Sequence, residues 1–452
     1  MPTTPDSKPD EAIRPAPTEL GATIRQLGPG LIISAVIVGS GELIVTPKLG
    51  AAVGFQLLWF IILGCFIKVF VQIELARFAI THRLTSLEAL NSVPGPRWVV
   101  SWLVWLWLLM YVALVFQVAG MVGGLASVFQ LAGLALPNWL LTVVVAASCA
   151  VLLVMGRYAL VEKVSILLVA LFVVAMLVAV GTLQTTSYAI SWSQLGEGLT
   201  FRMPEKFTIA FATFGIIGVG ASELIYYPYW CLEKGYGRSI GENDHSAAWV
   251  DRARGWLRIL RIDAWFSFAI YTTTTLAFYL LGAAILHAKG LEVEGRHMIN
   301  TLSHMFRETL GQWSFWLFLV GSFAVLYSTV FGATASNARL FADALSVYGL
   351  RRYRSPEERM RWVKIGCVAL PVAFATVYLV FGDPVSLVFV GALAQGLMLP
   401  FLGMAALYFH YRRTDPALKS RRAGVVCLWV AVICMVIAGG YKVIEEISKL
   451  LK

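Results

Sequence analysis

The sequence predicts an all-α polytopic membrane protein, built from a five-plus-five inverted repeat of helices and one extra helix. Three observations lead to this fold class: the composition, a series of long apolar runs, and a short phrase that the chain repeats. Of the 452 residues, 58% are hydrophobic and 14% are charged, and the mean hydropathy is +0.75. This composition excludes a soluble globular protein and a disordered chain. The net charge of +10 does not require a nucleic-acid partner, because the charges lie in the loops.

The apolar runs give the expected membrane spans. A helix of about 20 residues crosses a hydrocarbon core of about 30 Å. Eleven such runs are found, at residues 29–47, 55–76, 98–120, 138–156, 161–182, 207–230, 263–286, 313–334, 362–381, 384–408 and 423–441. The expected domains are a flexible cytoplasmic tail (1–28), a transporter domain (29–441, with repeat one at about 29–182, repeat two at about 207–408 and the extra helix at 423–441) and an extracytoplasmic tail (442–452).

The repeated phrase defines the inverted repeat. Residues 38–47 read VGSGELIVTP and residues 219–228 read VGASELIYYP. The two copies lie in the first and sixth predicted spans, as two repeats of five helices require. An odd number of spans separates the repeats, so the second is inverted relative to the first. Helices one and six are therefore expected to be broken, with a substrate site between them.

Lys and Arg residues set the expected orientation. Of the 36, 26 fall in one set of alternate segments, nine in the other, and Lys68 lies inside a span. Because cytoplasmic loops carry the excess of positive charge, the N-terminus is predicted to be cytoplasmic and the C-terminus extracytoplasmic. The protein is thus expected to be integral to the membrane, which is the plasma (inner) membrane if the source is bacterial.

Each copy of the phrase places one carboxylate, Glu42 or Glu223, well inside an apolar run. Ionisable residues at this depth indicate a functional site, although both could be first-turn helix acids that only complement the helix dipole. The small residues before each glutamate favour unwinding, which would free carbonyl oxygens to bind a cation. The predicted substrate-binding residues are Gly39, Ser40, Gly41, Glu42, Val219, Gly220, Ser222 and Glu223, with Glu42 and Glu223 as metal ligands.

Other polar residues in the spans are candidates for coupling or gating. Lys68 either snorkels to the membrane surface or pairs with a carboxylate, for which Glu42, Glu223 and Glu74 are candidates. The remaining candidates are Gln117, Tyr226, Tyr227 and Gln395. The glutamines could equally form interhelical hydrogen bonds, and the tyrosines could belong to an interfacial aromatic belt.

Several stretches outside the phrase resemble one known family. They are GPGLIISAV at 28–36, LGAAVGFQLLW at 49–59, GRYALVEKV at 156–164, FGIIG at 214–218 and LPF at 399–401. With them, nearly the whole chain resembles the Nramp (natural resistance-associated macrophage protein) family of proton-coupled divalent-metal transporters. This resemblance implies a LeuT-like fold, and it places the family's metal site at the two copies of the phrase.

The functional motifs depart from that family. Where the family has DPGN in its first span, this chain has Gly39-Ser40-Gly41-Glu42. Where the family has MPH in its sixth span, this chain has Ser222-Glu223-Leu224, so the soft methionine ligand and the histidine are replaced. The family's acidic pair of span three falls on Leu114 and Gln117, and its span-ten glutamine falls on Ala392, near Gln395. The resemblance thus implies a divergent member that keeps the scaffold and the place of the site.

The predicted function is secondary active transport of a small inorganic cation by alternating access. Carboxylate, hydroxyl and carbonyl oxygens favour a hard divalent metal such as Mg²⁺ or Mn²⁺. The alternative is a small organic or zwitterionic solute, carried with or without a proton, which the Lys68 ammonium would favour. No enzyme activity and no cofactor are expected, and a membrane sensor or scaffold is a weaker hypothesis. The expected partners are the transported ion or solute and the lipid bilayer, with no nucleic acid and a monomer as the functional unit.

Overall fold

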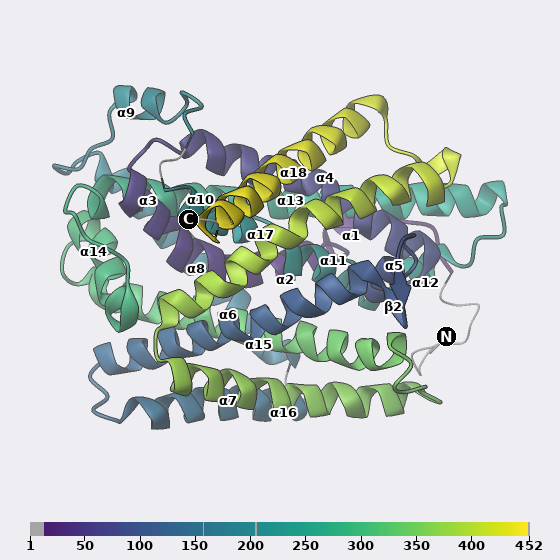
Figure 1. The fold of residues 1–452 in the computed structure, drawn as a ribbon, viewed down its shortest axis with the longest axis horizontal. Coiled ribbons are helices and arrows are strands. Elements are labelled where there is room, and N and C mark those ends of the chain that lie inside the picture. Colours follow the sequence, from purple (N-terminus) through teal and green to yellow (C-terminus); the bar gives the residue numbers. More distant parts are fainter. Residues whose placement is uncertain (1–12, 157, 204–205, 451–452) are drawn as a thin grey trace.

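The fold is a bundle of membrane-length helices, seen side-on in Figure 1. The computed structural model describes residues 13–156, 158–203 and 206–450, with the side chains of residues 40–41, 158–166, 168 and 450 excepted. Two two-residue strands, β1 (Arg97–Trp98) and β2 (Val100–Ser101), pair antiparallel before α6. The helices are α1 (Leu20–Ile24), α2 (Pro29–Ile37), η2 (Val38–Val45), α3 (Thr46–Val53), α4 (Leu58–His82), α5 (Ser86–Asn91), α6 (Trp102–Leu131), α7 (Asn138–Val154), α8 (Tyr158–Leu183), α9 (Trp192–Glu197), α10 (Phe207–Ile216), α11 (Ala221–Glu233), α12 (Tyr236–Ile240), α13 (Ala247–Leu281), η3 (Gly282–Leu286), η4 (Gly295–His297), α14 (Met298–Leu310), α15 (Ser314–Val347), α16 (Pro356–Phe381), α17 (Pro384–Tyr408), η5 (Phe409–Arg413), η6 (Pro416–Leu418) and α18 (Arg422–Leu450).

The predicted fold class is confirmed: the described chain is helical and forms membrane spans. Nine helical segments of the described residues are long and apolar enough to cross a bilayer, and each coincides with a predicted run. The two remaining predicted runs, 138–156 and 161–182, coincide with α7 and α8, for which shorter apolar stretches of Asn138–Val154 and Val169–Leu183 are described. The count of eleven spans therefore stays a prediction.

The first predicted span is interrupted, although it does not uncoil. Between α2 and α3 the backbone adopts the wider π-helix over Val38–Val45. Gly39 in this segment packs directly on α15, where an added Cβ would lie 1.8 Å from the Thr329 hydroxyl oxygen. Thr329 also donates a hydrogen bond of 2.9 Å to the carbonyl of Val36, just before the π segment. The expected unwinding of helix one thus takes the form of a π bulge, which is common at functional sites.

The sixth predicted span has a true break. The helix α10 ends at Ile216, and α11 restarts at Ala221 after four non-helical residues. Gly218 in this break has a φ of +55°, a left-handed conformation that glycine adopts without steric cost. The predicted restart near the second glutamate is found, because Glu223 lies in the first turn of α11.

Two predicted boundaries differ from the structure. The seventh predicted span begins at residue 263, but residues 247–262 already form the first turns of α13, a continuous helix of 35 residues. At about 1.5 Å per residue this helix is about 52 Å long, so it extends well beyond a hydrocarbon core of about 30 Å. The segment predicted as an extracytoplasmic tail is mostly helical too, because α18 continues to Leu450.

The N-terminal tail from residue 13 onward makes contacts with the transporter domain. The amide of Arg14 donates to the carbonyl of Ser239 at 3.1 Å. The indole of Trp256 donates to the carbonyl of Arg14 at 3.0 Å, and Arg258 donates to the carbonyl of Pro17 at 2.8 Å. This part of the tail therefore lies against α12 and α13. Residues 1–12 of the predicted flexible tail are outside the described residues.

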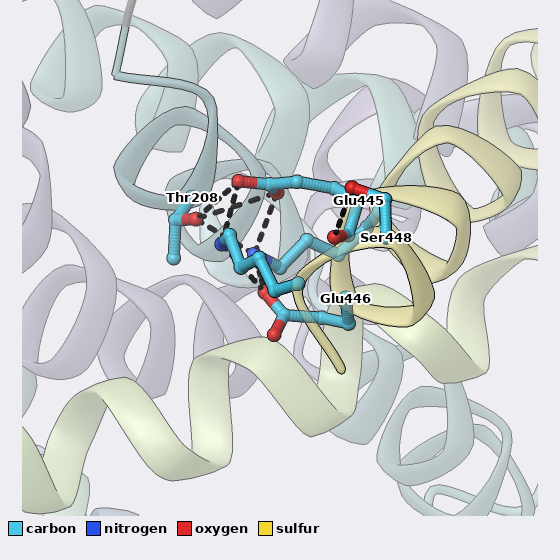
Figure 2. Close-up of polar contacts among 6 residues, drawn as sticks. Thr208, Glu445, Glu446 and Ser448 are labelled. Carbon is cyan, nitrogen blue, oxygen red and sulfur yellow. Dashed lines mark hydrogen bonds and ion pairs between the residues drawn. The ribbon is translucent and has the colours of Figure 1, made fainter. Parts of the chain in front are cut away.

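The extra helix α18 is tied to the first half of helix six. Lys442 of α18 is buried, and its ammonium donates to the hydroxyl of Thr208 at 2.6 Å. The same ammonium contacts Glu445 at 2.8 Å and Glu446 at 2.6 Å on its own helix. Figure 2 shows this network joining the end of α18 to the start of α10. The added helix is thus bound by polar contacts to a helix that carries the site.

Candidate functional site

Glu42 lies at the centre of the candidate site and is fully buried in the described structure. Its carboxylate accepts hydrogen bonds from Thr275 at 2.6 Å, Thr46 at 3.0 Å and the backbone amide of Gly218 at 3.2 Å. These donors come from α13, from α3 and from the break of helix six. Because charge-assisted hydrogen bonds are the strong ones, Glu42 fixes the π segment of helix one against the two other elements.

Glu223 is buried on the opposite side of the break and belongs to a cluster of oxygen atoms around Gly220. A Cβ added to Gly220 would lie 2.6 Å from a carboxylate oxygen of Glu223, 2.6 Å from the amide oxygen of Gln395 and 3.1 Å from the carbonyl oxygen of Gly215. Three oxygens of different chemical type therefore converge at the start of α11. Carboxylate, amide and carbonyl oxygens are the ligand types that a hard cation prefers.

Lys68 takes neither of the two positions predicted for it. Its side chain is fully buried on α4, so it does not snorkel to the surface. The ammonium donates to the carbonyl of Phe214 and, at 2.8 Å, to the carbonyl of Ile217, and it lies 4.7 Å from the centre of the Phe214 ring. In the described part of the chain, no direct hydrogen bond or ion pair is found between Lys68 and Glu42 or Glu223.

The carbonyls that hold Lys68 are the ones that the break of helix six exposes. Phe214 lies in the last turn of α10, and Ile217 directly follows that helix. A helix end leaves four carbonyl groups without helical partners, and a buried end must satisfy them in another way. In the described structure these carbonyls accept hydrogen bonds from the ammonium of Lys68, and the prediction that they bind a transported cation stays a prediction.

The two predicted glutamines form one hydrogen-bonded chain across three helices. Gln395 of α17 accepts from both the backbone amide and the hydroxyl of Ser222, each at 2.9 Å. Its amide nitrogen donates to the side-chain oxygen of Gln117 on α6 at 2.8 Å. The interhelical hydrogen bond considered for these residues is therefore present, and it ends at the candidate site.

Tyr226 and Tyr227 lie inside the protein, with exposed fractions of 2% and 0%, and not in a lipid-facing belt. The Tyr226 hydroxyl donates to the side chain of Asn337 at 2.9 Å. The Tyr227 hydroxyl donates to Asp263 at 2.9 Å, and the same carboxylate oxygen accepts the backbone amide of Gly30 at 2.7 Å. The tyrosines thus join α11 to α15, to α13 and, through Asp263, to the start of helix one.

The rest of the predicted site is partly described. Gly39 packs against α15, and Val219 is buried in the break. The side chains of Ser40 and Gly41 are outside the described residues. Among the described residues, no three His, Cys, Asp or Glu side chains are grouped to hold a metal ion. A bound cation would therefore rely on two carboxylates together with hydroxyl, amide and carbonyl oxygens.

Sequence reasoning missed Thr46, Asn337 and Asp263 as partners of the site. Thr46 follows Glu42 by four residues, a spacing that brings side chains together on a helix, so it could have been found. The other two are far from their partners in the sequence and carry no local signal. Their contacts depend on tertiary packing.

Comparisons with known proteins agree with this architecture. The family model for "natural resistance-associated macrophage protein-like" (Nramp) matches residues 30–445. A search of curated protein sequences gave no match.

Solved structures with the same fold include a variant of the manganese transporter of Eremococcus coleocola, with 15% identity, a TM-score of 0.67 and coverage of 97% of this chain and 90% of that one. They also include Mhp1, a nucleobase-cation-symport-1 family transporter, with 14% identity, a TM-score of 0.57 and coverage of 92% of both chains. A Na⁺-coupled sialic acid symporter matches with 13% identity, a TM-score of 0.51 and coverage of 93% of both chains. These likenesses concern the fold, whereas the family match covers most of the sequence. The chain belongs to the Nramp family and has the LeuT-like fold that the resemblance to this family implied.

Proposed function

We propose that this protein is a secondary transporter that carries a small divalent metal cation by alternating access, with Mg²⁺ and Mn²⁺ as the expected substrates. The observation that carries the proposal is the oxygen cluster around Gly220, formed by Glu223, Gln395 and Gly215 next to a break in helix six. Membership of the Nramp family and the shared fold with a manganese transporter support the same function.

Glu42 and Glu223 are the proposed metal ligands. Both are carboxylates, and hard divalent cations prefer carboxylate, amide and carbonyl oxygens. The position after Ser222 holds a glutamate and then Leu224, so no thioether is present there to favour soft metals. Three donors already contact the Glu42 carboxylate, so a cation would bind at its remaining lone pair or replace one of these donors.

Alternating access would act through the helices that meet at the site. In this fold class, substrate sites lie where discontinuous helices face each other, and one bundle rocks against the rest. Tyr226, Tyr227, Gln117 and Gln395 connect α11 to the surrounding helices, so we assign them to gating. Lys68 is assigned to coupling, because its ammonium lies on the carbonyls of the break.

A second candidate substrate is a small organic or zwitterionic solute, and one observation favours it. The ammonium of Lys68 occupies carbonyl oxygens that a bare cation could otherwise use. A solute with a carboxylate would be attracted by Lys68, and a solute with an ammonium group by the glutamates. This candidate predicts binding without any requirement for a divalent metal.

A flux assay in proteoliposomes tests the proposal. Mg²⁺, Mn²⁺, Ca²⁺ and Cd²⁺ are compared as substrates with the wild type, with Glu42→Gln, with Glu223→Gln and with Glu292→Gln. The control Glu292 is an exposed loop carboxylate, so the same chemical change is made outside the site. We expect Mg²⁺ or Mn²⁺ uptake to fall at least about tenfold in the two site variants, as for loss of about 1.4 kcal/mol or more, and to persist in the control.

The outcome that contradicts the metal proposal is absence of uptake for all four ions by correctly inserted wild-type protein. Thermal-shift measurements with organic solutes then address the second candidate. A solute that stabilises the wild type and not Glu42→Gln would establish it.

The remaining assignments complete the proposal. We assign the protein to a membrane, which is the plasma (inner) membrane if the source is bacterial, with a cytoplasmic N-terminus, an extracytoplasmic C-terminus and the lipid bilayer as its main partner. One copy of the chain holds all the proposed site residues, which is why we propose a functional monomer. The transporter domain is assigned to residues 29–441, and no chemical catalysis is assigned.

A further inference from the structure

A second polar site lies away from the helix breaks, in a pocket between α4, α13 and the start of α18. The three helices are neighbours in the bundle (Figure 1). The pocket has a volume of about 160 Å³ and is open on one side. Its lining residues are Phe70, Ile73, Glu74, Arg77, Arg261, Trp265, Ser420, Arg421, Gly424 and Leu428.

Arg77 is the buried anchor of this pocket, with an exposed fraction of 3%. Its guanidinium donates to Glu74 at 2.7 Å and to the hydroxyl of Ser420 at 2.7 Å. The third nitrogen of the guanidinium, Nε, is buried without a hydrogen-bond partner. The other carboxylate oxygen of Glu74 lies 3.3 Å from Nδ1 of His410. Glu74 therefore lies between the side chains of Arg77 and His410, with a hydrogen bond to Arg77.

Two more arginines extend into the same pocket from the other helices. Among the described contacts, the side chain of Arg261 donates only to the carbonyl of Leu257, on its own helix. For the side chain of Arg421 no contact is described. Arg77, Arg261 and Arg421 line the same pocket, so their like charges repel one another. The pocket lining thus contains three arginines and one glutamate, so its positive charge is incompletely balanced. An anion would relieve the repulsion.

The other end of the pocket is apolar and aromatic. On α4, Phe66, Phe70, Ile73 and Arg77 recur every three or four residues, so they lie along one face of the helix. Trp265 of α13 stacks edge-on against Phe70 at 5.6 Å and also contacts Phe66 at 6.1 Å. The exposed fractions of Phe66 and Trp265 are 40% and 37%, so these rings face the lipid-exposed surface of the bundle. The face therefore changes from aromatic to basic toward one end.

We propose that this pocket binds an anionic phospholipid, with the phosphate on Arg77, Arg261 and Arg421 and an acyl chain along the rings of Phe66, Phe70 and Trp265. Guanidinium groups bind phosphate oxygens through paired N–H donors, and a partner-free donor on Arg77 is available. The positive end coincides with the predicted cytoplasmic side, where anionic headgroups gather. The aromatic end is the reason for choosing a lipid over free phosphate as the source of the anion.

The test compares ligands and variants on the purified full-length protein in detergent. Binding of phosphatidylglycerol, phosphatidylcholine and inorganic phosphate is measured by native mass spectrometry and by thermal unfolding. The test variant is Arg261→Gln with Arg421→Gln, two exposed positions whose change leaves the buried Arg77 in place. The matched control is Arg352→Gln with Arg354→Gln, which removes two exposed arginines at a loop outside the pocket.

We expect phosphatidylglycerol to bind and stabilise the wild type and the control, and to bind the test variant about 30-fold more weakly, at about 1 kcal/mol for each arginine. Phosphatidylcholine should bind at least tenfold more weakly than phosphatidylglycerol to the wild type. Equal binding of phosphatidylglycerol by the test variant and the control would overturn the proposal, as would stabilisation by inorganic phosphate equal to that by the lipid. The melting temperature of the lipid-free test variant checks that it is folded. The result does not depend on whether the protein transports a metal.

Discussion

At the scale of single residues, Lys68 shows how a buried charge is accommodated inside a membrane protein. An ammonium in an apolar interior is costly unless hydrogen bonds replace its water. Lys68 finds those bonds on the carbonyls of Phe214 and Ile217, which need donors themselves because helix six is broken there. The ammonium of Lys68 and the free carbonyls of the break therefore satisfy each other's hydrogen-bonding requirement. Neither would be stable in this form without the other.

Replacing Lys68 with methionine tests this dependence. The variant keeps a long side chain but leaves two buried carbonyls without a donor, at about 1–3 kcal/mol for each unsatisfied group. We expect the melting temperature of the purified protein to fall by several degrees. Lys364→Met, at an exposed position of α16, is the control and should melt like the wild type. A Lys68→Met protein as stable as the wild type would show that the carbonyls do not need the ammonium.

Gly39 permits the close contact of helix one with α15. An alanine there would place its Cβ 1.8 Å from the Thr329 hydroxyl and 2.4 Å from the carbonyl of Val325, so the two helices would have to separate. We expect Gly39→Ala to destabilise the fold by about 1–3 kcal/mol, as overpacking does. Circular dichroism during thermal unfolding measures the change. Gly181→Ala, at a position with open space, should cause no loss of stability, and an unchanged melting temperature for Gly39→Ala would contradict the contact.

At the scale of elements, the two copies of one phrase form different backbones. The first copy is a π segment at Val38–Val45, and the second begins in the extended break before α11. The residues immediately before the second copy explain part of the difference, because Gly218 takes a left-handed φ that stops α10. In the first copy the carbonyl of Val36 is instead satisfied by Thr329 of α15. The repeated sequence thus determines where each helix is interrupted. The preceding residues and the packing partners determine whether the interruption is a π segment or an extended break.

The hydrogen-bonded chain of Gln117, Gln395 and Ser222 joins α6, α17 and α11, and a single substitution at Gln395 removes it. Gln395→Leu would leave the amide and hydroxyl of Ser222 and the side chain of Gln117 without their partner. We expect a loss of stability of about 1–2 kcal/mol, because hydrogen bonds between membrane helices are modest. Thermal unfolding is the readout, and Gln130→Leu at an exposed position of α6 is the control. Equal melting of both variants would argue against a connection through Gln395.

The sequence was sufficient to predict the fold class and the residues that meet at the break. Apolar length predicted the spans, and the repeated phrase predicted where helices one and six are interrupted. The partners of those residues were harder to predict. Asn337 and Asp263 are identifiable only after the helices are packed, and the Lys68 site consists of backbone carbonyls, which every residue possesses. Backbone ligands leave no residue type for a sequence pattern to detect.

At the scale of the whole molecule, α13 connects the two broken helices. This single helix carries Asp263, which binds the backbone of Gly30 and the hydroxyl of Tyr227, and Thr275, which binds Glu42. Both contacts therefore lie on one continuous helix of 35 residues. The extra helix α18 adds a separate tie to α10 through Lys442.

The orientation of the whole molecule can be tested with reporter fusions at the C-terminus. The bias of positive charge predicts that the C-terminus is extracytoplasmic. A C-terminal alkaline phosphatase fusion should therefore be active in bacterial cells, whereas a C-terminal green fluorescent protein fusion should be dark. An N-terminal fluorescent fusion is the internal control and should be bright. The reverse pattern would place the proposed lipid pocket on the other side of the membrane.

Two of the partners of Glu42 are synthesised long after Glu42 itself. Thr275 follows Glu42 by 233 residues, and the backbone amide of Gly218 follows it by 176. At roughly 5–20 residues per second, helix one waits roughly 10–50 seconds after its synthesis before helix seven emerges from the ribosome. During that interval its glutamate has only Thr46, four residues away, among its eventual side-chain partners. Until the second repeat has been synthesised, the nascent helix therefore has to be held in the translocon or by an insertase, or the Glu42 carboxyl group has to stay protonated. Cells that lack such assistance should release the first repeat as a substrate for membrane proteases.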